Sequence, residues 1–167
     1  MFFYIMEESF ELTEEVAMER ITARDVIPIL HAAFARYETD PIPSSALQET
    51  VESVQASEAN GALWLGWKQM NQVIAVVRYD QHATEATFSR LAVHPDYQQQ
   101  GIASQCLVWL EQFARSQDVV LMQAKVRASE PDNLAFYQRR GYDIVSHEIT
   151  INGNGHAVKT ISIAKQL

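Results

Sequence analysis

The sequence predicts an α/β protein built on a mixed, mostly antiparallel sheet of six or seven strands, with about four helices covering both faces. Short apolar segments typical of strands alternate with segments in which apolar residues recur at helical spacing. In the middle of the chain a strand, a helix and a second strand follow one another at 84–93, 101–115 and 119–126, which indicates a right-handed parallel crossover. Antiparallel hairpins are expected on either side of this unit. The 167 residues, 47% of them hydrophobic, suffice for one domain spanning 1–167.

Two helices and a hairpin are expected in the first half of the chain. Val26, Ile29 and Leu30 begin an apolar helical face, and the two prolines within 40–43 end that helix. A second helix follows and ends at residues 60–61, where Asn and Gly favour a helix C-terminus. We expect a strand at 17–21, a helix from Thr22 or Asp25 to about Tyr37, a helix from Ser44 or Ser45 to Asn60, and strands at 62–68 and 73–79.

The second half supplies the crossover and a terminal hairpin. Because side chains alternate along a strand, the odd-numbered residues of 84–93, among them Ser89, should share one face, and Phe88 and Ala92 the other. The nearly continuous apolar run at 119–126 is typical of a strand covered on both faces. The remaining elements are a helix at 101–115, a helix from Pro131 to Arg140, and strands at 142–151 and 157–163.

Composition narrows the classes of function. The net charge of −8 argues against a nucleic-acid partner, because binding a polyanion requires a basic face. The single cysteine, Cys106, excludes an internal disulfide and a cysteine zinc cluster, and the five histidines lack the spacing of metal ligands, so no metal is expected. The acidic residues between Glu7 and Glu19 form either a solvated surface or a field that attracts a cationic amine.

The first residues bear on localisation. Residues 1–6 are apolar, but they lack a basic flank and are followed at once by Glu7 and Glu8. They therefore fit neither a signal peptide nor a membrane span. We expect a cytoplasmic protein without a membrane partner.

The loop that follows strand 84–93 has the pattern of an anion site. Pro95 ends the strand, and Gly101 lets the backbone turn tightly just before the next helix. The backbone N–H groups from Gln100 to Ala103 then stand unpaired at a helix N-terminus, at the positive end of the helix dipole. A phosphate group is the expected partner.

This loop and a second motif together resemble the GNAT superfamily of acyl-coenzyme A dependent N-acetyltransferases. The first motif reads Leu-Ala-Val-His-Pro at 91–95 and Gln-Gln-Gln-Gly-Ile-Ala at 98–103; the second reads Phe-Tyr-Gln-Arg-Arg-Gly-Tyr at 136–142. Both stand in the family's order, with an apolar strand between them. The resemblance implies a GNAT fold, in which the central parallel strands splay apart. It also implies transfer of an acetyl group from acetyl-coenzyme A to a primary amine of a small molecule or peptide.

The resemblance also assigns roles to residues. The loop would hold the coenzyme pyrophosphate, and the end of the preceding strand would pair through its backbone with the pantetheine arm. Tyr137 is the candidate general acid, because an ordinary tyrosine stays protonated at neutral pH and can donate to a departing thiolate. The implied cofactor-binding residues are Leu91, Ala92, Val93, Gln98, Gln99, Gln100, Gly101, Ile102, Ala103, Ser104, Asn133 and Tyr137.

The chain departs from the family's pattern in two places. Family members often carry Arg or Lys in the pyrophosphate loop, whereas this chain has three glutamines. Either a cation approaches from elsewhere or the affinity is lower; the candidate cations are Lys125, Arg127, Arg139 and Arg140. Glu130 stands where many members have an asparagine, and Asn133 is a candidate to take over that ligand contact.

No residue is assigned as the general base. Glu85, the nearest carboxylate on the strand, is about 20 Å from Leu91 at the rise of a strand, which is too far for direct contact. Three sources stay open: Ser89 anchoring a water relay, a residue of the N-terminal helices, or the Tyr79-Asp80 region.

Other functions also stay open. A non-catalytic acyl-coenzyme A binding module with a regulatory role would use the same loop. A mononucleotide site is disfavoured, because no lysine and no Ser or Thr follow the last glycine. The sequence does not identify the amine acceptor, and it leaves open a homodimer through the last strands.

Overall fold

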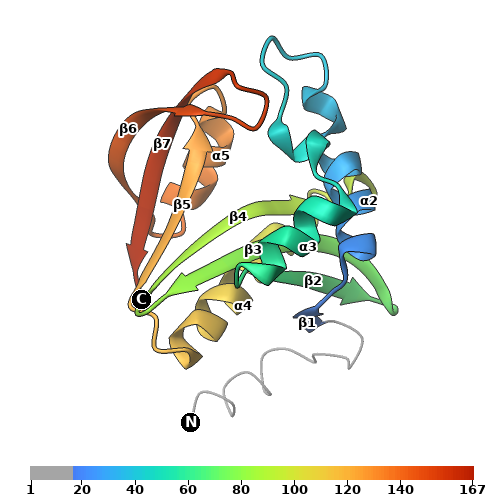
Figure 1. The fold of residues 1–167 in the computed structure, drawn as a ribbon. Helices are drawn as coiled ribbons and strands as arrows, with labels where there is room; N and C mark the ends of the chain where they lie inside the picture. The colour runs from blue at the N-terminus through green and yellow to red at the C-terminus, as the bar shows by residue number, and fades with distance from the viewer. Residues whose placement is uncertain (1–16) are drawn as a thin grey trace.

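A computed structural model describes residues 17–167 of the chain, and Figure 1 shows the fold. Residues 1–6 and the acidic residues from Glu7 to Glu15, on which the expectations about localisation and amine attraction rest, lie outside the described residues. The strands are β1 (Ala17–Arg20), β2 (Leu63–Gln69), β3 (Gln72–His82), β4 (Glu85–Val93), β5 (Leu121–Arg127), β6 (Asp143–Ile151) and β7 (Ala157–Gln166). The helices are α2 (Ala23–Phe34), α3 (Val51–Ala59), α4 (Ile102–Ser116) and α5 (Pro131–Gln138), with 3-10 helices η1 (Ala35–Tyr37), η2 (Ser45–Gln48) and η3 (Pro95–Tyr97).

The described strands form one sheet in the order β1-β2-β3-β4-β5-β7-β6. Neighbouring strands run antiparallel except β4 and β5, which are parallel and are joined through α4. Because β7 returns between β5 and β6, β6 lies at the edge of the sheet. The predicted mixed sheet, with its parallel crossover and its two hairpins, is confirmed.

Two apolar cores lie on opposite faces of this sheet. On one face Leu107 and Leu110 of α4 are buried against the strands, and Tyr137 of α5 packs against the same cluster. On the other face Val26 and Leu30, one turn apart on α2, are fully buried against β2, β3 and β4. Figure 1 shows α2 and α3 together on that second side. The helical periodicity of the sequence therefore identifies the buried face of each long helix.

Arg90 interrupts the regular alternation of β4. Its φ of 56° is left-handed, and the pairing with β3 gains an extra residue between Ser89 and Ala92. Such a β-bulge moves every later side chain to the opposite face of the sheet. Phe88 therefore packs in the core beside α4, and Ala92 packs in the core beside α2. The prediction that Phe88 and Ala92 share one face is wrong, because alternation holds only while the pairing is regular.

The two central strands separate beyond the first third of β4. Their parallel pairing ends at Thr87 and Gln123, whereas β5 continues beside β7 as far as Arg127. The splayed pair implied by the family resemblance is therefore present. On the side that faces β5, the backbone of β4 from Phe88 onward is left without a strand partner among the described residues.

Two predictions about single elements need correction. β5 is not covered on both faces: within 122–126 alternate residues are buried, but Lys125 is exposed, because the splay leaves one face of the strand open. The single helix expected from Ser44 or Ser45 to Asn60 is two pieces, η2 and α3. Glu49 between them has an extended backbone (ψ 133°), and the Thr50 hydroxyl caps α3 by accepting a 3.1 Å hydrogen bond from a backbone N–H.

Gly66 in β2 is a position where the core has no room for a side chain. A Cβ placed there would lie 2.6 Å from Cγ2 of Ile21 and 3.2 Å from Cγ1 of Val73. We expect Gly66→Ala to lower the free energy of unfolding by about 1–3 kcal/mol, because overpacking forces neighbouring side chains off their rotamers. Denaturant titration measures this change.

The matched control is Gly153→Ala, whose Cβ would meet the Cβ of Ser45 at an ordinary 3.6 Å. Its free energy of unfolding should stay within about 0.5 kcal/mol of the parent. Equal losses in the two variants would show that lack of space at Gly66 is not the cause.

Candidate active site

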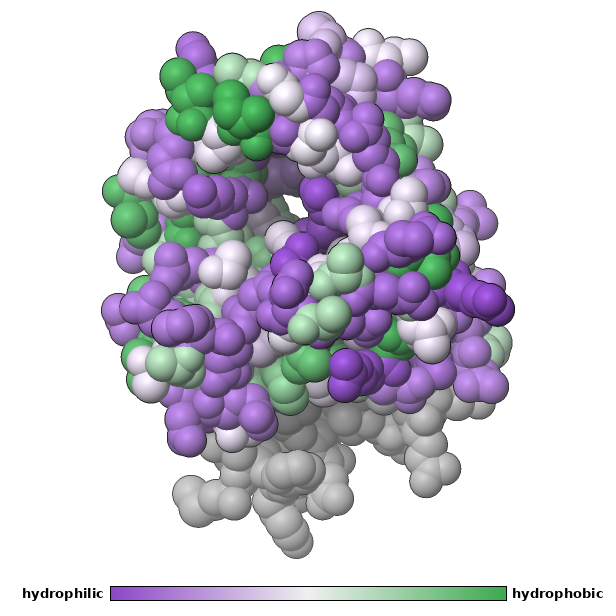
Figure 2. Space-filling model, viewed as in Figure 1, coloured by the Kyte–Doolittle hydropathy of each residue, from purple (hydrophilic) through white to green (hydrophobic). Residues whose placement is uncertain are grey.

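A cavity of about 190 Å³ opens where β4 and β5 separate. Its walls come from the end of α2, η1, β4, β5 and the first turns of α5. Figure 2 shows an opening through the molecule between the side of β5 and β7 and the side of α2. The lining residues with reactive or polar side chains are Tyr37, Ser44, Ser89, Arg90, Lys125, Arg127, Glu130, Asn133 and Tyr137, and Leu91 also lines it.

The loop between β4 and α4 is held in shape by its own groups. Nε2 of Gln98 donates a 3.0 Å hydrogen bond to the carbonyl of Val93, so this side chain closes the loop. Nδ1 of His94 accepts a 3.2 Å hydrogen bond from a backbone N–H two residues later. Gln99 and Gly101 have left-handed φ values of 62° and 77°, and Gly101 is the N-cap of α4. The backbone thus makes the tight turn that the glycine predicts.

The backbone N–H groups from Gln99 to Ser104 have no backbone acceptor among residues 17–167. The first hydrogen bond into α4 runs from the N–H of Gln105 to the carbonyl of Gly101, at 3.1 Å. Free donors at the positive end of a 15-residue helix form an arrangement that binds phosphate.

Arg140 brings a cation to this helix end. Its guanidinium donates to Oγ of Ser104 in the first turn of α4 and, at 2.7 Å, to the carbonyl of Phe136. The guanidinium carbon also lies 3.7 Å from the centre of the Phe136 ring. A cation beside the positive end of a helix dipole is electrostatically unfavourable unless an anion joins them. No carboxylate of the described residues lies within ion-pair distance of Arg140.

The other three candidate cations lack this position. Lys125 pairs with Glu148 at 2.7 Å, and Arg127 donates to two carbonyls of the segment before η2. Arg139 makes no contact with the loop in the described part of the chain. The structure therefore singles out Arg140, which sequence reasoning left as one of four.

Tyr137 lies in the wall of the cavity, on α5. Its ring packs against those of Phe88, Phe136 and Tyr142, with centroids 5.6, 5.0 and 5.8 Å away. Burial raises the pKa of the Tyr137 phenol to about 12. Among the described residues its hydroxyl has no hydrogen-bond partner, so its proton is available to a ligand in the cavity.

Glu130 and Tyr37 meet at the cavity although 93 positions separate them. The Tyr37 hydroxyl donates a 3.2 Å hydrogen bond to Oε2 of Glu130, which joins η1 to the start of α5. Desolvation is the main cause that raises the pKa of Tyr37. Sequence reasoning noted Glu130 only as a departure from the family's asparagine. That departure was the one sign in the sequence that Glu130 has a special role, because a contact between residues 93 positions apart leaves no local pattern.

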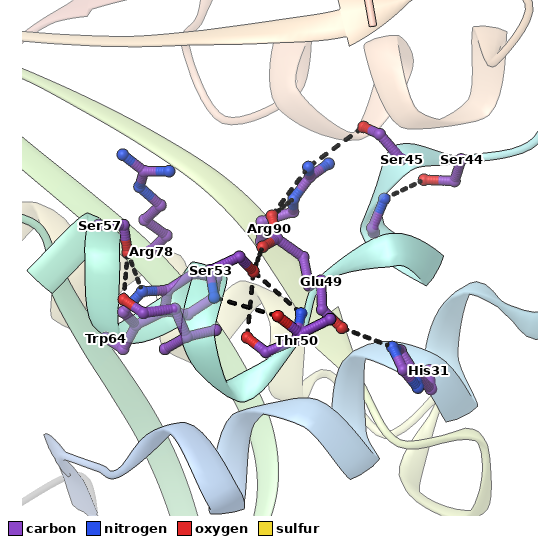
Figure 3. A network of polar contacts seen from close by, with 12 residues as sticks. His31, Ser44, Ser45, Glu49, Thr50, Ser53, Ser57, Trp64, Arg78 and Arg90 are labelled. Atoms are coloured by element: carbon purple, nitrogen blue, oxygen red, sulfur yellow. Dashed lines mark hydrogen bonds and ion pairs between the residues drawn. The ribbon is translucent and has the colours of Figure 1, made fainter. Parts of the chain in front are cut away.

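Two arginines hold the segment at 42–49 by hydrogen bonds, and Ser44 of this segment lines the cavity. Arg127 of β5 donates to the carbonyls of Ile42 and Pro43, at 2.7 and 2.9 Å. Arg90, at the bulge of β4, donates to Oε1 of Glu49 at 3.1 Å and to Oγ of Ser45 at 3.1 Å, as Figure 3 shows. One wall of the cavity is thus tied to both splayed strands.

Of the three candidate sources of a general base, two contribute a residue to the cavity lining and one does not. Ser89 lines it, as does Tyr37 from the N-terminal helical region. The Tyr79-Asp80 region does not line it: the Tyr79 hydroxyl donates to a glutamine, and Asp80 is bound by Arg78 on the same strand. In residues 17–167 no group of three or more His, Cys, Asp or Glu is placed to hold a metal ion. Nor does any described helix have the length and apolar character needed to cross a membrane.

A splayed parallel pair, a glycine loop with free amides and a half-buried tyrosine beside the gap are the features that the resemblance to the GNAT superfamily implies. The model of the acetyltransferase (GNAT) family matches residues 27–142, and the chain belongs to this family. A curated relative is the UPF0157 protein YqkA of Bacillus subtilis (strain 168), 27% identical over 129 residues. The match covers 74% of this chain and 35% of YqkA, so the chain spans about a third of that relative.

Solved structures confirm the fold. The ribosomal-protein-S18-alanine N-acetyltransferase of Escherichia coli superposes with a TM-score of 0.71 at 20% identity, over 90% of this chain and 93% of that chain. The PaiA N-acetyltransferase of Thermoplasma acidophilum, solved in complex with coenzyme A, gives a TM-score of 0.69 at 14% identity, over 91% and 99%. The IAA acetyltransferase of Bacillus cereus ATCC 14579 gives 0.65 at 23%, also over 91% and 99%.

Proposed function

We propose that this protein transfers an acetyl group from acetyl-coenzyme A to a primary amine, by direct attack of the amine on the thioester. The observation that carries the proposal is the cavity itself. It joins the gap between β4 and β5 to a half-buried tyrosine whose proton has no partner among the described residues. The free amides at the start of α4 supply the anion site that a coenzyme pyrophosphate requires. Family membership and a neighbour solved with coenzyme A support the choice of donor.

Three groups of the protein take part in this reaction: backbone N–H groups of β4, the Tyr137 hydroxyl and the Glu130 carboxylate. The bond between the amine nitrogen and the acetyl carbonyl carbon forms while the carbon–sulfur bond breaks. Backbone N–H groups of β4 near Leu91 to Val93, on the side without a β5 partner, stabilise the negative charge on the carbonyl oxygen. Tyr137 gives its proton to the departing thiolate, and its raised pKa keeps that proton in place until then.

The amine must be neutral when it attacks, and Glu130 is the carboxylate placed to take up its proton. Glu130 lines the cavity. Its Oε2 accepts the hydrogen bond from Tyr37, which leaves Oε1 to accept the proton of the amine. A carboxylate acts as a base directly or through one water molecule. Ser89 remains the alternative anchor of a water relay, because it lines the same cavity.

The test is a thiol-release assay with acetyl-coenzyme A against amino acids, polyamines, aminoglycosides and short peptides. Turnover with any amine class, together with product mass increased by one acetyl group, supports the proposal. Coenzyme binding without turnover across all classes would instead favour a regulatory module that binds acyl-coenzyme A without catalysis.

We expect Arg140→Ala to weaken acetyl-coenzyme A binding about tenfold, because a charge-assisted hydrogen bond to phosphate contributes at least ~1.4 kcal/mol. The dissociation constant, measured by calorimetry at several salt concentrations, should also lose part of its salt dependence. Arg140→Lys should recover some affinity, since it keeps the charge but loses the planar fork.

Arg139→Ala is the matched comparison, because it removes the neighbouring positive charge without touching Ser104. Its dissociation constant should change much less. Equal weakening in both alanine variants would mean that overall charge, and not the position of Arg140 at the start of α4, determines the affinity.

A further inference from the structure

The charges that line the cavity are unevenly compensated. The charged lining residues are Arg90, Lys125, Arg127 and Glu130. Arg90 is neutralised by Glu49, and Lys125 is neutralised by Glu148. Hydrogen bonds from Lys125 and two serines hold the pKa of Glu148 at about 2, so this carboxylate stays charged at neutral pH. Arg90 and Lys125 therefore present little net charge to a ligand.

The positive charge of Arg127 is not compensated by an ion pair within residues 17–167. Two of its five N–H donors are used by the carbonyls of Ile42 and Pro43, which are neutral acceptors. Among residues 17–167 no carboxylate lies within 4.0 Å of its guanidinium nitrogens. The guanidinium is partly buried, and its planar fork suits a carboxylate.

Glu130 forms no ion pair within residues 17–167. It is partly buried and accepts from the neutral Tyr37 hydroxyl, and no cation of the described residues lies within 4.0 Å of it. Arg36 donates a hydrogen bond to the same hydroxyl, but Arg36 itself is exposed to solvent. One cation and one anion without ionic partners thus line a cavity of about 190 Å³.

We propose that the acceptor is a small molecule that carries both a primary amine and a carboxylate, as a free amino acid does. This inference rests on the proposed acetyltransferase function and names its substrate class. Arg127 binds the acceptor carboxylate, and Glu130 binds the ammonium group and takes one of its protons. The neutral nitrogen then forms the bond to the acetyl carbon, the carbon–sulfur bond breaks, and the thiolate takes the proton of Tyr137. The second amine proton restores the Tyr137 hydroxyl, and Glu130 releases the first to solvent, so one proton is set free for each acetyl group transferred.

The same charges disfavour a polyamine. A second ammonium group would face Arg127 without a carboxylate to pair with, and like charges in a partly desolvated cavity repel.

The test compares each standard amino acid that has a primary α-amine with its own carboxamide as acceptor, in the thiol-release assay. The carboxamide keeps the amine and side chain but lacks the negative charge, and its less basic amine is more often neutral at pH 7. Intrinsic reactivity therefore favours the carboxamide. We expect the reverse for the best acceptor, a preference for the acid of about tenfold or more in kcat/KM, because the charged hydrogen bond is lost.

Arg127→Gln should remove this preference by lowering kcat/KM for the acid and not for the carboxamide. Arg127→Lys, which keeps the charge, should retain part of it. Because Arg127 also holds the segment at 42–43, the ratio between the two acceptors is the readout: a loosened segment lowers both acceptors equally. Lys68→Gln, which removes a cation on β2 outside the cavity lining, is the charge-matched control and should leave the ratio unchanged.

Thermal shift in the presence of coenzyme A gives a second readout that needs no turnover. The amino acid should raise Tm more than its carboxamide in the parent protein, and equally in Arg127→Gln. Turnover with a preference for carboxamides or polyamines, or an equal fall for both acceptors in Arg127→Gln, would overturn this inference while leaving the acetyltransferase proposal standing. No turnover with any amine, despite coenzyme binding, would overturn the acetyltransferase proposal and this inference with it.

Discussion

Replacing Tyr137 by Phe is expected to lower kcat by about 10²–10⁴-fold, the contribution of a positioned general acid. The phenyl ring keeps the packing against Phe88, Phe136 and Tyr142, so only the proton donor is lost. Affinity for acetyl-coenzyme A should stay within about twofold, since the loop and α4 are untouched. Steady-state turnover measures the first quantity, and calorimetry with coenzyme A measures the second.

Tyr79→Phe is the matched control, because it deletes the same atom from a buried tyrosine that does not line the cavity. Its kcat should equal that of the parent protein. If Tyr137→Phe turns over at the parent rate, the thiolate leaves without help from this residue, and the acid role fails.

The pH profile tests the same assignment independently. Burial raises the pKa of Tyr137 from an ordinary value of 10.0 to about 12, so the acid stays protonated from pH 6 to pH 10. With saturating acceptor, kcat should rise with pH as the bound amine loses its proton and then stay level through pH 10. A decline near pH 10 that disappears in Tyr137→Phe would show that the phenol ionises normally, contrary to expectation.

Gly101→Val is expected to weaken acetyl-coenzyme A binding by about 30- to 100-fold. The left-handed φ of 77° costs a β-branched residue roughly 1–2 kcal/mol, and its relaxation would turn amides of the loop away from the phosphate. Apart from its chain neighbours, no atom of residues 17–167 lies within 4 Å of a Cβ placed on Gly101, so a clash with that part of the chain is not the cause. The dissociation constant for acetyl-coenzyme A is the measurement.

Two further variants separate the causes. Gln99→Ala removes an exposed side chain at a neighbouring left-handed position and should change the dissociation constant by about twofold at most. Gly101→Asn tolerates the left-handed backbone, so it should bind more tightly than Gly101→Val if strain is the main cause. Similar weakening by Gln99→Ala and Gly101→Val would count against backbone amides as the source of affinity.

The fold was largely predictable because its signals are local. The apolar spacing of Val26, Ile29 and Leu30 predicts a buried helix face, and those residues are buried on α2. The turns between strands and the crossover at 84–126 were equally readable, since each depends on residues close together in the chain. The splayed pair came from family resemblance, because no local pattern states where two strands separate.

The candidate site was predictable only in part. The glycine loop and Tyr137 follow from two motifs, each contained within a few residues. The cation at the loop did not follow, because Arg140 reaches Ser104 across 36 positions. The bulge at Arg90 also escaped prediction, since nothing in an alternating strand pattern marks the residue at which alternation stops.

The sequence by itself determined most of the strands and helices, and that a tight glycine turn precedes α4, because these depend on periodicity and on backbone preferences of single residues. The tertiary structure alone decided the charges around the cavity. Arg127 contacts Ile42 over 85 positions and Tyr37 contacts Glu130 over 93. Whether a charge is neutralised or left for a ligand depends on partners that the folded sheet brings together, and no local pattern in the sequence records such partners.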